Sequence, residues 1–80
     1  MTNDAILEKV RRIVAEVSEV EIERVTLKSS PANLEEWDSL AQVNIVLSLE
    51  QEFGHQFSPD QIDSMVSVEK ILEVLTAHAA

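Results

Sequence analysis

The chain has 80 residues, no cysteine and a formal net charge of −9, and 45% of its residues are hydrophobic. Such a length makes one domain, residues 1–80, with no room for the buried pocket of an ordinary enzyme, and the missing cysteines exclude disulfides, thiolate metal sites and a cysteine nucleophile. Because no long apolar run is present, we expect neither a signal peptide nor membrane insertion, and hence a cytoplasmic protein.

The first predicted element is a helix from about Asn3 to Ser18. Its apolar residues recur at helical spacing with charged residues between them: Ile6, Leu7, Val10, Ile13, Val14 and Val17. The next apolar residues alternate roughly with polar ones, as in a strand: Val20, Ile22, Val25 and Leu27. A lone strand would have no partner in a helical chain. We therefore interpret this segment as a loop that its apolar side chains hold in place.

The loop continues to residue 37. Pro31 pushes the residue before it toward extended conformations, and its neighbours Ser29, Ser30 and Asn33 are typical of turns. Leu34 and Trp37 follow. A single aromatic residue in a long loop is usually a packing anchor, so we expect these two side chains to attach the loop to the core.

A second helix is predicted to begin at Ser39 and to end near Gly54, the only glycine, which is well placed as a C-terminal cap. This helix is apolar on more than one face. One stripe should enter the core: Ile45, Val46, Leu49 and Phe53. Leu40 and Leu47, seven residues apart, point away from the centre of that stripe. For Val43 we expect ordinary core packing.

Two further helix starts follow. Ser58 as cap, Pro59 at the first helical position and Gln61 at the third predict a short third helix. Ser67 with Glu69 begins the last helix, whose apolar residues share one face: Val68, Ile71, Leu72 and Leu75. The predicted fold is all-α, a small four-helix bundle of three longer helices and one short helix, with a long loop between the first two.

The acidic residues are concentrated in the middle of the chain. Residues 29–69 contain no Lys or Arg and eight acidic residues: Glu35, Glu36, Asp38, Glu50, Glu52, Asp60, Asp63 and Glu69. Such a field repels nucleic acid and anionic membranes and steers basic partner proteins toward it, although a solvated surface kept for solubility is the alternative. The acidic residues lack the spacing of a calcium-binding loop, so we predict no metal site.

Ser39 is the candidate for chemistry, and it has a structural alternative. Ser39 and Gln42 fit the S-x-x-Q capping box, and Asp38 could cap the helix equally well. Both histidines, His55 and His78, sit at or after predicted helix ends, so neither is a convincing general base for Ser39. A self-activated serine nucleophile is therefore not expected.

From Asp38 the chain reads DSLAQVNIVLSLEQEF. This segment resembles the second helix of the acyl carrier protein family, with the attachment serine at its start, apolar residues at the same spacing and Glu-Phe at its end. The resemblance covers essentially the whole chain, because residues 6–17, 20–37, 57–60 and 67–77 are similar to the first helix, the long loop, the short third helix and the fourth.

The resemblance implies that Ser39 carries a phosphopantetheine arm from coenzyme A, that Asp38 orients this site, and that the arm's thiol holds an acyl group as a thioester. It also implies a phosphopantetheinyl transferase that uses magnesium, and enzymes that load and transfer the cargo in lipid, polyketide or other specialised biosynthesis. The chain is then a carrier and not an enzyme. Leu40 and Leu47 resemble positions that meet these enzymes, and we add Glu36 and Glu50 as docking residues for basic partner surfaces.

The chain departs from typical primary-metabolism members at three positions. Glu36 stands where they have glycine, and Ala41 and Asn44 stand where they have acidic residues that dock synthase enzymes. These departures favour a specialised-pathway carrier, which we expect to be a monomer. An aminoacyl carrier, for example a D-alanyl or peptidyl carrier, is the nearest alternative. An unmodified acidic helical adaptor is the alternative from a different class.

Overall fold

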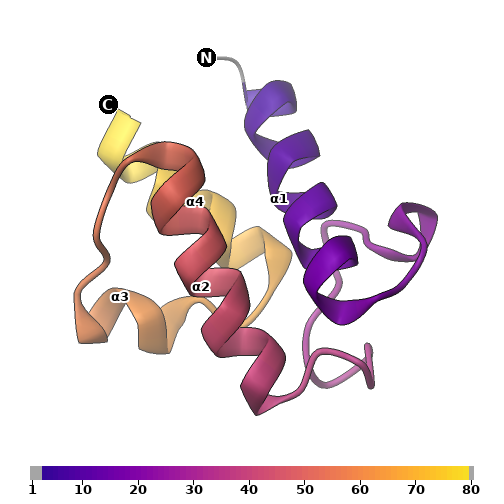
Figure 1. The fold of residues 1–80 in the computed structure, drawn as a ribbon. Coiled ribbons are helices and arrows are strands. Elements are labelled where there is room, and N and C mark those ends of the chain that lie inside the picture. Colours follow the sequence, from indigo (N-terminus) through magenta and orange to yellow (C-terminus); the bar gives the residue numbers. More distant parts are fainter. Residues whose placement is uncertain (1–2, 80) are drawn as a thin grey trace.

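The computed structural model describes residues 3–79, and all the regular structure in that range is helical (Figure 1). The elements are α1 (Asn3–Ser18), the 3-10 helix η1 (Ile22–Arg24), α2 (Ser39–Phe53), α3 (Pro59–Ser64) and α4 (Val68–Ala79). The predicted all-α fold, with three longer helices and one short one, is therefore confirmed. Within residues 3–79, every helix is too short or too polar to cross a membrane.

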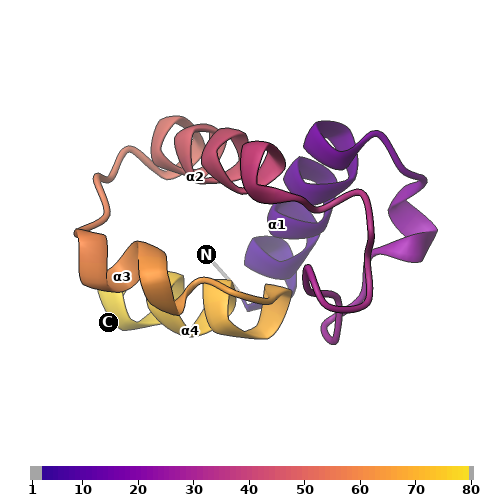
Figure 2. The same ribbon diagram turned by 90° about the horizontal axis from the view of Figure 1, so that it is seen from below.

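The helices enclose one apolar core. α1 packs against both α2 and α4, and α3 contacts α4. In the view from below, α2 lies at the top and α4 at the bottom, with α1 to the right and α3 to the left (Figure 2). Nine large side chains are almost completely buried between them: Trp37, Ile45, Leu49, Met65, Ile71, Val10, Val14, Val25 and Val68. Burial of this apolar surface is the main source of stability in a domain of this size.

The long loop is held to α1 by Arg11. Its guanidinium donates hydrogen bonds from Nε to the Val25 carbonyl at 2.7 Å and from Nη2 to the Ile22 carbonyl at 3.0 Å. Val25, Leu34 and Trp37 are buried, which confirms the expected apolar anchors, but Leu27 is exposed. The expectation for Leu27 was wrong because it lies in a turn at residues 27–28, where the chain reverses away from the core.

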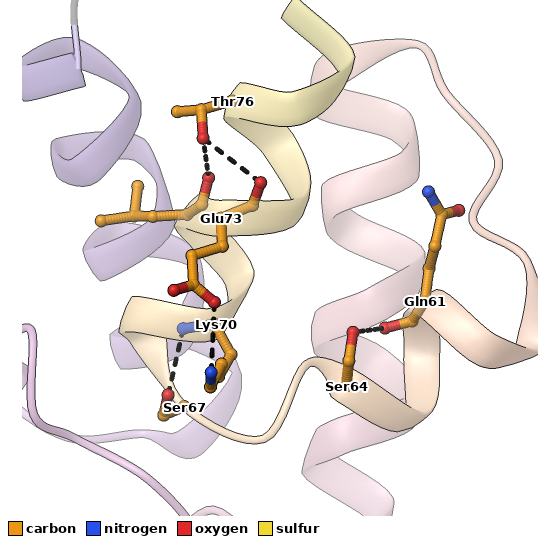
Figure 3. Close-up of polar contacts among 7 residues, drawn as sticks. Gln61, Ser64, Ser67, Lys70, Glu73 and Thr76 are labelled. Carbon is orange, nitrogen blue, oxygen red and sulfur yellow. Dashed lines mark hydrogen bonds and ion pairs between the residues drawn. The ribbon is translucent and has the colours of Figure 1, made fainter.

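Helix starts and ends follow the local signals in the sequence. Gly54 caps α2 in the left-handed conformation, with φ of 62°, a region that glycine enters without the steric cost of a Cβ. Ser58 and Gln61 form the full capping box at the start of α3. At the start of α4 the Ser67 hydroxyl accepts a hydrogen bond from the Lys70 amide at 3.1 Å (Figure 3). The predicted end of α2 and the predicted starts of α3 and α4 are thereby confirmed.

The two faces of α2 have different surroundings. Ile45 and Leu49 are 0% exposed, whereas Leu40, Val43 and Leu47 are 71%, 56% and 51% exposed. The expectation that Val43 packs in the core is therefore wrong. Residues 40, 43 and 47 fall on one side of a helix at i, i+3 and i+7, so Val43 shares the outward face of the two leucines. We call these three residues the α2 stripe.

We predict that Leu49→Ala lowers the free energy of unfolding by roughly 2–5 kcal/mol, because it leaves a cavity in a closed core. Leu47→Ala, on the outer face of the same helix, should cost under about 1 kcal/mol. Chemical denaturation followed by circular dichroism measures both. Equal losses for the two variants would show that Leu47 contributes to the core.

Candidate functional site

Ser39 is the first residue of α2, and its side chain is exposed. Asp38, directly before it, is the N-cap: its backbone is extended and its Oδ1 accepts a hydrogen bond from the Ala41 amide at 2.9 Å. Of the two capping possibilities in the sequence, the structure has the aspartate and not the serine. Within residues 3–79 the Ser39 hydroxyl makes no hydrogen bond, so it is available to an incoming reagent.

A chain of hydrogen bonds lies beneath this serine. The buried Trp37 indole donates from Nε1 to Gln42 Oε1 at 2.6 Å, and Gln42 Nε2 donates to the Met65 carbonyl at 2.9 Å. We call this the Trp37–Gln42–Met65 bridge. It joins the end of the loop to the first turn of α2 and to the residue that follows α3. One signal for this bridge is present in the sequence, since a buried indole N–H requires an acceptor, but the acceptor could not be predicted.

A surface cavity of about 630 Å³ opens beside Ser39. Its walls come from the loop, from the first turn of α2, and from α3 and the residues after it: Trp37, Ser39, Gln42, Ile62, Asp63 and Val66. A slightly larger cavity of about 680 Å³ lies between the end of α1 and η1, and neither Ser39 nor Asp38 lines it. We therefore take the cavity beside the free hydroxyl as the site.

The residues predicted to meet partner enzymes lie in different environments. Leu40 and Leu47 are exposed on the α2 stripe. Glu36 accepts hydrogen bonds from Arg24 at 3.0 and 3.2 Å, and these bonds hold the pKa of the Glu36 carboxyl below its ordinary value. Glu50 is half-buried, and its Oε2 accepts a hydrogen bond from the Phe57 amide at 3.0 Å. Both carboxylates thus have contacts inside the chain.

The other candidate groups lie away from Ser39. His55 follows the C-terminal end of α2, at the opposite end of the helix, and the side chain of His78 lies outside the described residues. In the part of the chain that the structure describes, no group of three or more histidine or acidic side chains is placed to hold a metal ion. His55 is therefore not positioned as a base for Ser39 in the described residues.

Known proteins are similar to this chain over nearly its whole length. A family model described as "Phosphopantetheine attachment site" matches residues 8–75. The acyl carrier protein of Coprothermobacter proteolyticus is 30% identical over 78 residues, which cover 98% of this chain and 95% of that protein. The acyl carrier proteins of Thermosynechococcus vestitus and Petrotoga mobilis are 32% and 30% identical, over 100% and 95% of this chain and 99% and 89% of their own lengths.

Asp38 can be tested separately as a cap and as a charge. We predict that Asp38→Ala lowers the free energy of unfolding by about 1 kcal/mol, because the Ala41 amide loses its acceptor. Asp38→Asn keeps a side-chain oxygen and should be close to the wild type in stability, since asparagine caps helices about as well. Thermal melts of the three proteins measure this. An equal loss in both variants would mean that the charge matters and not the cap.

Proposed function

This chain belongs to the acyl carrier protein family, and we propose that Ser39 is the residue to which its phosphopantetheine group is attached. Proteins of this family are carriers and not enzymes, and phosphopantetheine is their covalent prosthetic group. The observation that supports Ser39 is its exposed hydroxyl, which has no bond within the described residues and lies at the first position of α2 beside an open cavity.

The surroundings of Ser39 fit a phosphodiester. A negative charge at a helix N-terminus is stabilised by the helix dipole and by the backbone N–H groups of the first turn that lack partners within the helix. Asp38 already caps the Ala41 amide and therefore leaves the serine oxygen unused. The exposed side chain gives a modifying enzyme direct access, and the cavity beside it has room for the arm.

The attachment step is a displacement at phosphorus. The Ser39 oxygen forms a bond to the coenzyme A phosphorus nearest pantetheine, and the bond from that phosphorus to the ADP portion breaks. The leaving group is 3′,5′-ADP, and the hydroxyl proton goes to a base on a phosphopantetheinyl transferase that binds magnesium. Asp38, next to the serine, is the residue that we propose to orient this site toward the transferase.

The attached arm supplies a thiol that holds an acyl group as a thioester. Tethering raises the effective concentration of the group at each enzyme that docks beside Ser39. We propose the α2 stripe as the apolar part of that docking surface, because it begins at Leu40, next to the serine, and holds three of the exposed large apolar side chains of the protein. Glu36 and Glu50 would contribute negative charge at its border, where basic partner surfaces are steered.

Within the family, we propose a dedicated acyl carrier of a specialised pathway. Ala41 is buried and Asn44 is exposed, so neither position presents the negative charge that the resemblance associates with docking to synthase enzymes. An aminoacyl cargo is the alternative, and the mass of the loaded protein from its native cell distinguishes the two. Location in the cytoplasm and a monomeric state stay predictions from the sequence.

The attachment site is tested with coenzyme A, magnesium and a broad-specificity phosphopantetheinyl transferase. We expect the intact mass of the wild type to rise by one arm, and Ser39→Ala to stay unmodified, because the attacking oxygen is gone. Ser48→Ala, farther along α2, is the matched control and should be modified like the wild type. An unmodified wild type, under conditions that modify another carrier, would instead favour the unmodified adaptor.

The docking surface is tested by transfer rates. We predict that Leu47→Ala lowers kcat/KM of the transferase by about fivefold, equivalent to about 1 kcal/mol of lost contact. The exposed Leu27, in the loop between α1 and α2, provides a matched leucine outside the α2 stripe, and Leu27→Ala should leave the rate unchanged. Equal rates for wild type and Leu47→Ala would remove Leu47 from the docking surface without affecting the assignment of Ser39.

A further inference from the structure

We propose that Arg24 is an internal competitor for the docking carboxylate of Glu36, so that an arginine of a partner enzyme has to displace Arg24 before it can bind there. The partner class is an enzyme with a guanidinium group at the edge of the surface that contacts the α2 stripe. This inference rests on the proposed function, because it takes Ser39 as the point of attachment and Glu36 as part of the docking surface. It adds a contact within the chain that weakens docking.

Glu36 lies at the border of the α2 stripe. Together with Leu40, the first residue of the stripe, it lines a surface cavity of about 420 Å³ between the end of α1 and the start of α2. Two further acidic residues, Glu19 and Asp38, line the same cavity, and the described residues around it include no Lys or Arg. A cationic side chain of a partner that docks on the stripe would therefore meet negative charge at this point.

Arg24 already occupies the Glu36 carboxylate. Its Nη1 donates a hydrogen bond to Glu36 Oε2 at 3.0 Å, and its Nη2 donates one to Oε1 at 3.2 Å. A guanidinium recognises a carboxylate by this two-point geometry. Arg24 belongs to η1 and does not line the cavity that Glu36 shares with Leu40. Both oxygens of Glu36 are thus engaged in the same contact that a partner arginine would make.

The pair can be exchanged because it lies in solvent. The side chains of Arg24 and Glu36 are 51% and 40% exposed, and exposed pairs contribute little to stability. The hydrogen bonds between them lower the pKa of the Glu36 carboxyl and raise the pKa of the Arg24 guanidinium, so both groups are charged at neutral pH. A partner guanidinium therefore competes with another cation for one anion, and the loss of the internal pair reduces the net gain from docking.

The loop has other anchors on either side of this pair. Arg11 binds the carbonyl of Val25, the residue after Arg24, and Trp37, the residue after Glu36, is buried. The removal of the Arg24 guanidinium should therefore free the Glu36 carboxylate while the backbone beside both residues keeps its place.

The test measures kcat/KM of the phosphopantetheinyl transferase, with the carrier as the varied substrate. Intact mass after complete reaction is measured first, so a failure of attachment at Ser39 is recognised separately. We expect kcat/KM to rise by about two- to fivefold in Arg24→Gln, the range that an exposed ion pair can contribute. Lys28→Gln removes another exposed cation of the same loop and is the matched control for net charge, expected within about 1.5-fold of the wild type. A rate for Arg24→Gln no higher than that for Lys28→Gln would overturn the proposal.

A double variant shows whether Arg24 acts through Glu36. Once Glu36→Gln has removed the carboxylate, no anion is left to compete for, so adding Arg24→Gln should give the same kcat/KM as Glu36→Gln alone. Arg24→Lys keeps the charge but loses the two-point contact, and its gain should be smaller than that of Arg24→Gln. Circular dichroism of each variant checks that the fold is unchanged. If the gain persists in the double variant, Arg24 acts by its charge alone and the proposal fails.

Discussion

Burial of the Trp37 side chain is the constraint on which the region around Ser39 depends. The loop between α1 and α2 covers residues 19–38, which is long for a connection inside a small domain, and it needs anchors at several points. Trp37 is the last of them. Once its indole is buried, its N–H requires an acceptor, and Gln42 can provide one only from the first turn of α2. This arrangement fixes the direction in which α2 leaves the loop and places Asp38 and Ser39 at the surface.

The charged residues have a secondary role in holding this arrangement. Arg11 is the exception, because two of its donors bind loop carbonyls and replace hydrogen bonds that the loop cannot form within itself. Lys9, Arg24 and Lys70 form surface pairs, such as Lys9 with Glu52 at 3.8 Å, and pairs of this kind contribute little to stability. Since residues 29–69 carry no Lys or Arg, the main effect of charge is a negative field around the attachment region. The fold therefore relies on apolar burial, and recognition is the role that we propose for the charges.

Features that depend on residues close in the sequence were predicted correctly, whereas features that depend on residues distant in the sequence were missed. The bounds of α2, the Gly54 cap and the Ser58 capping box are local, because each is decided within about one helical turn. Val43 and Leu27 were misplaced because their exposure depends on which other elements cover them. The functions of Arg11 and Gln42 could not be predicted, since the carbonyls that they bind lie 11 to 23 residues away in the sequence. For Ser39, the sequence left open which residue caps α2, and the structure has Asp38.

Because Asp38 caps α2 and Ser39 does not, modification of Ser39 has little effect on folding. The Asp38 carboxylate accepts the hydrogen bond of the Ala41 amide in the first turn of α2, and the serine hydroxyl contributes no hydrogen bond to the folded state within the described residues. A group joined to that oxygen therefore breaks no hydrogen bond of the folded state. Apart from its interaction with the helix dipole, modification of Ser39 leaves the free energy of folding unchanged. If Ser39 carries the arm as we propose, loading and release of the cargo would break no hydrogen bond of the Ser39 side chain, so the start of α2 could keep the same capping contact throughout.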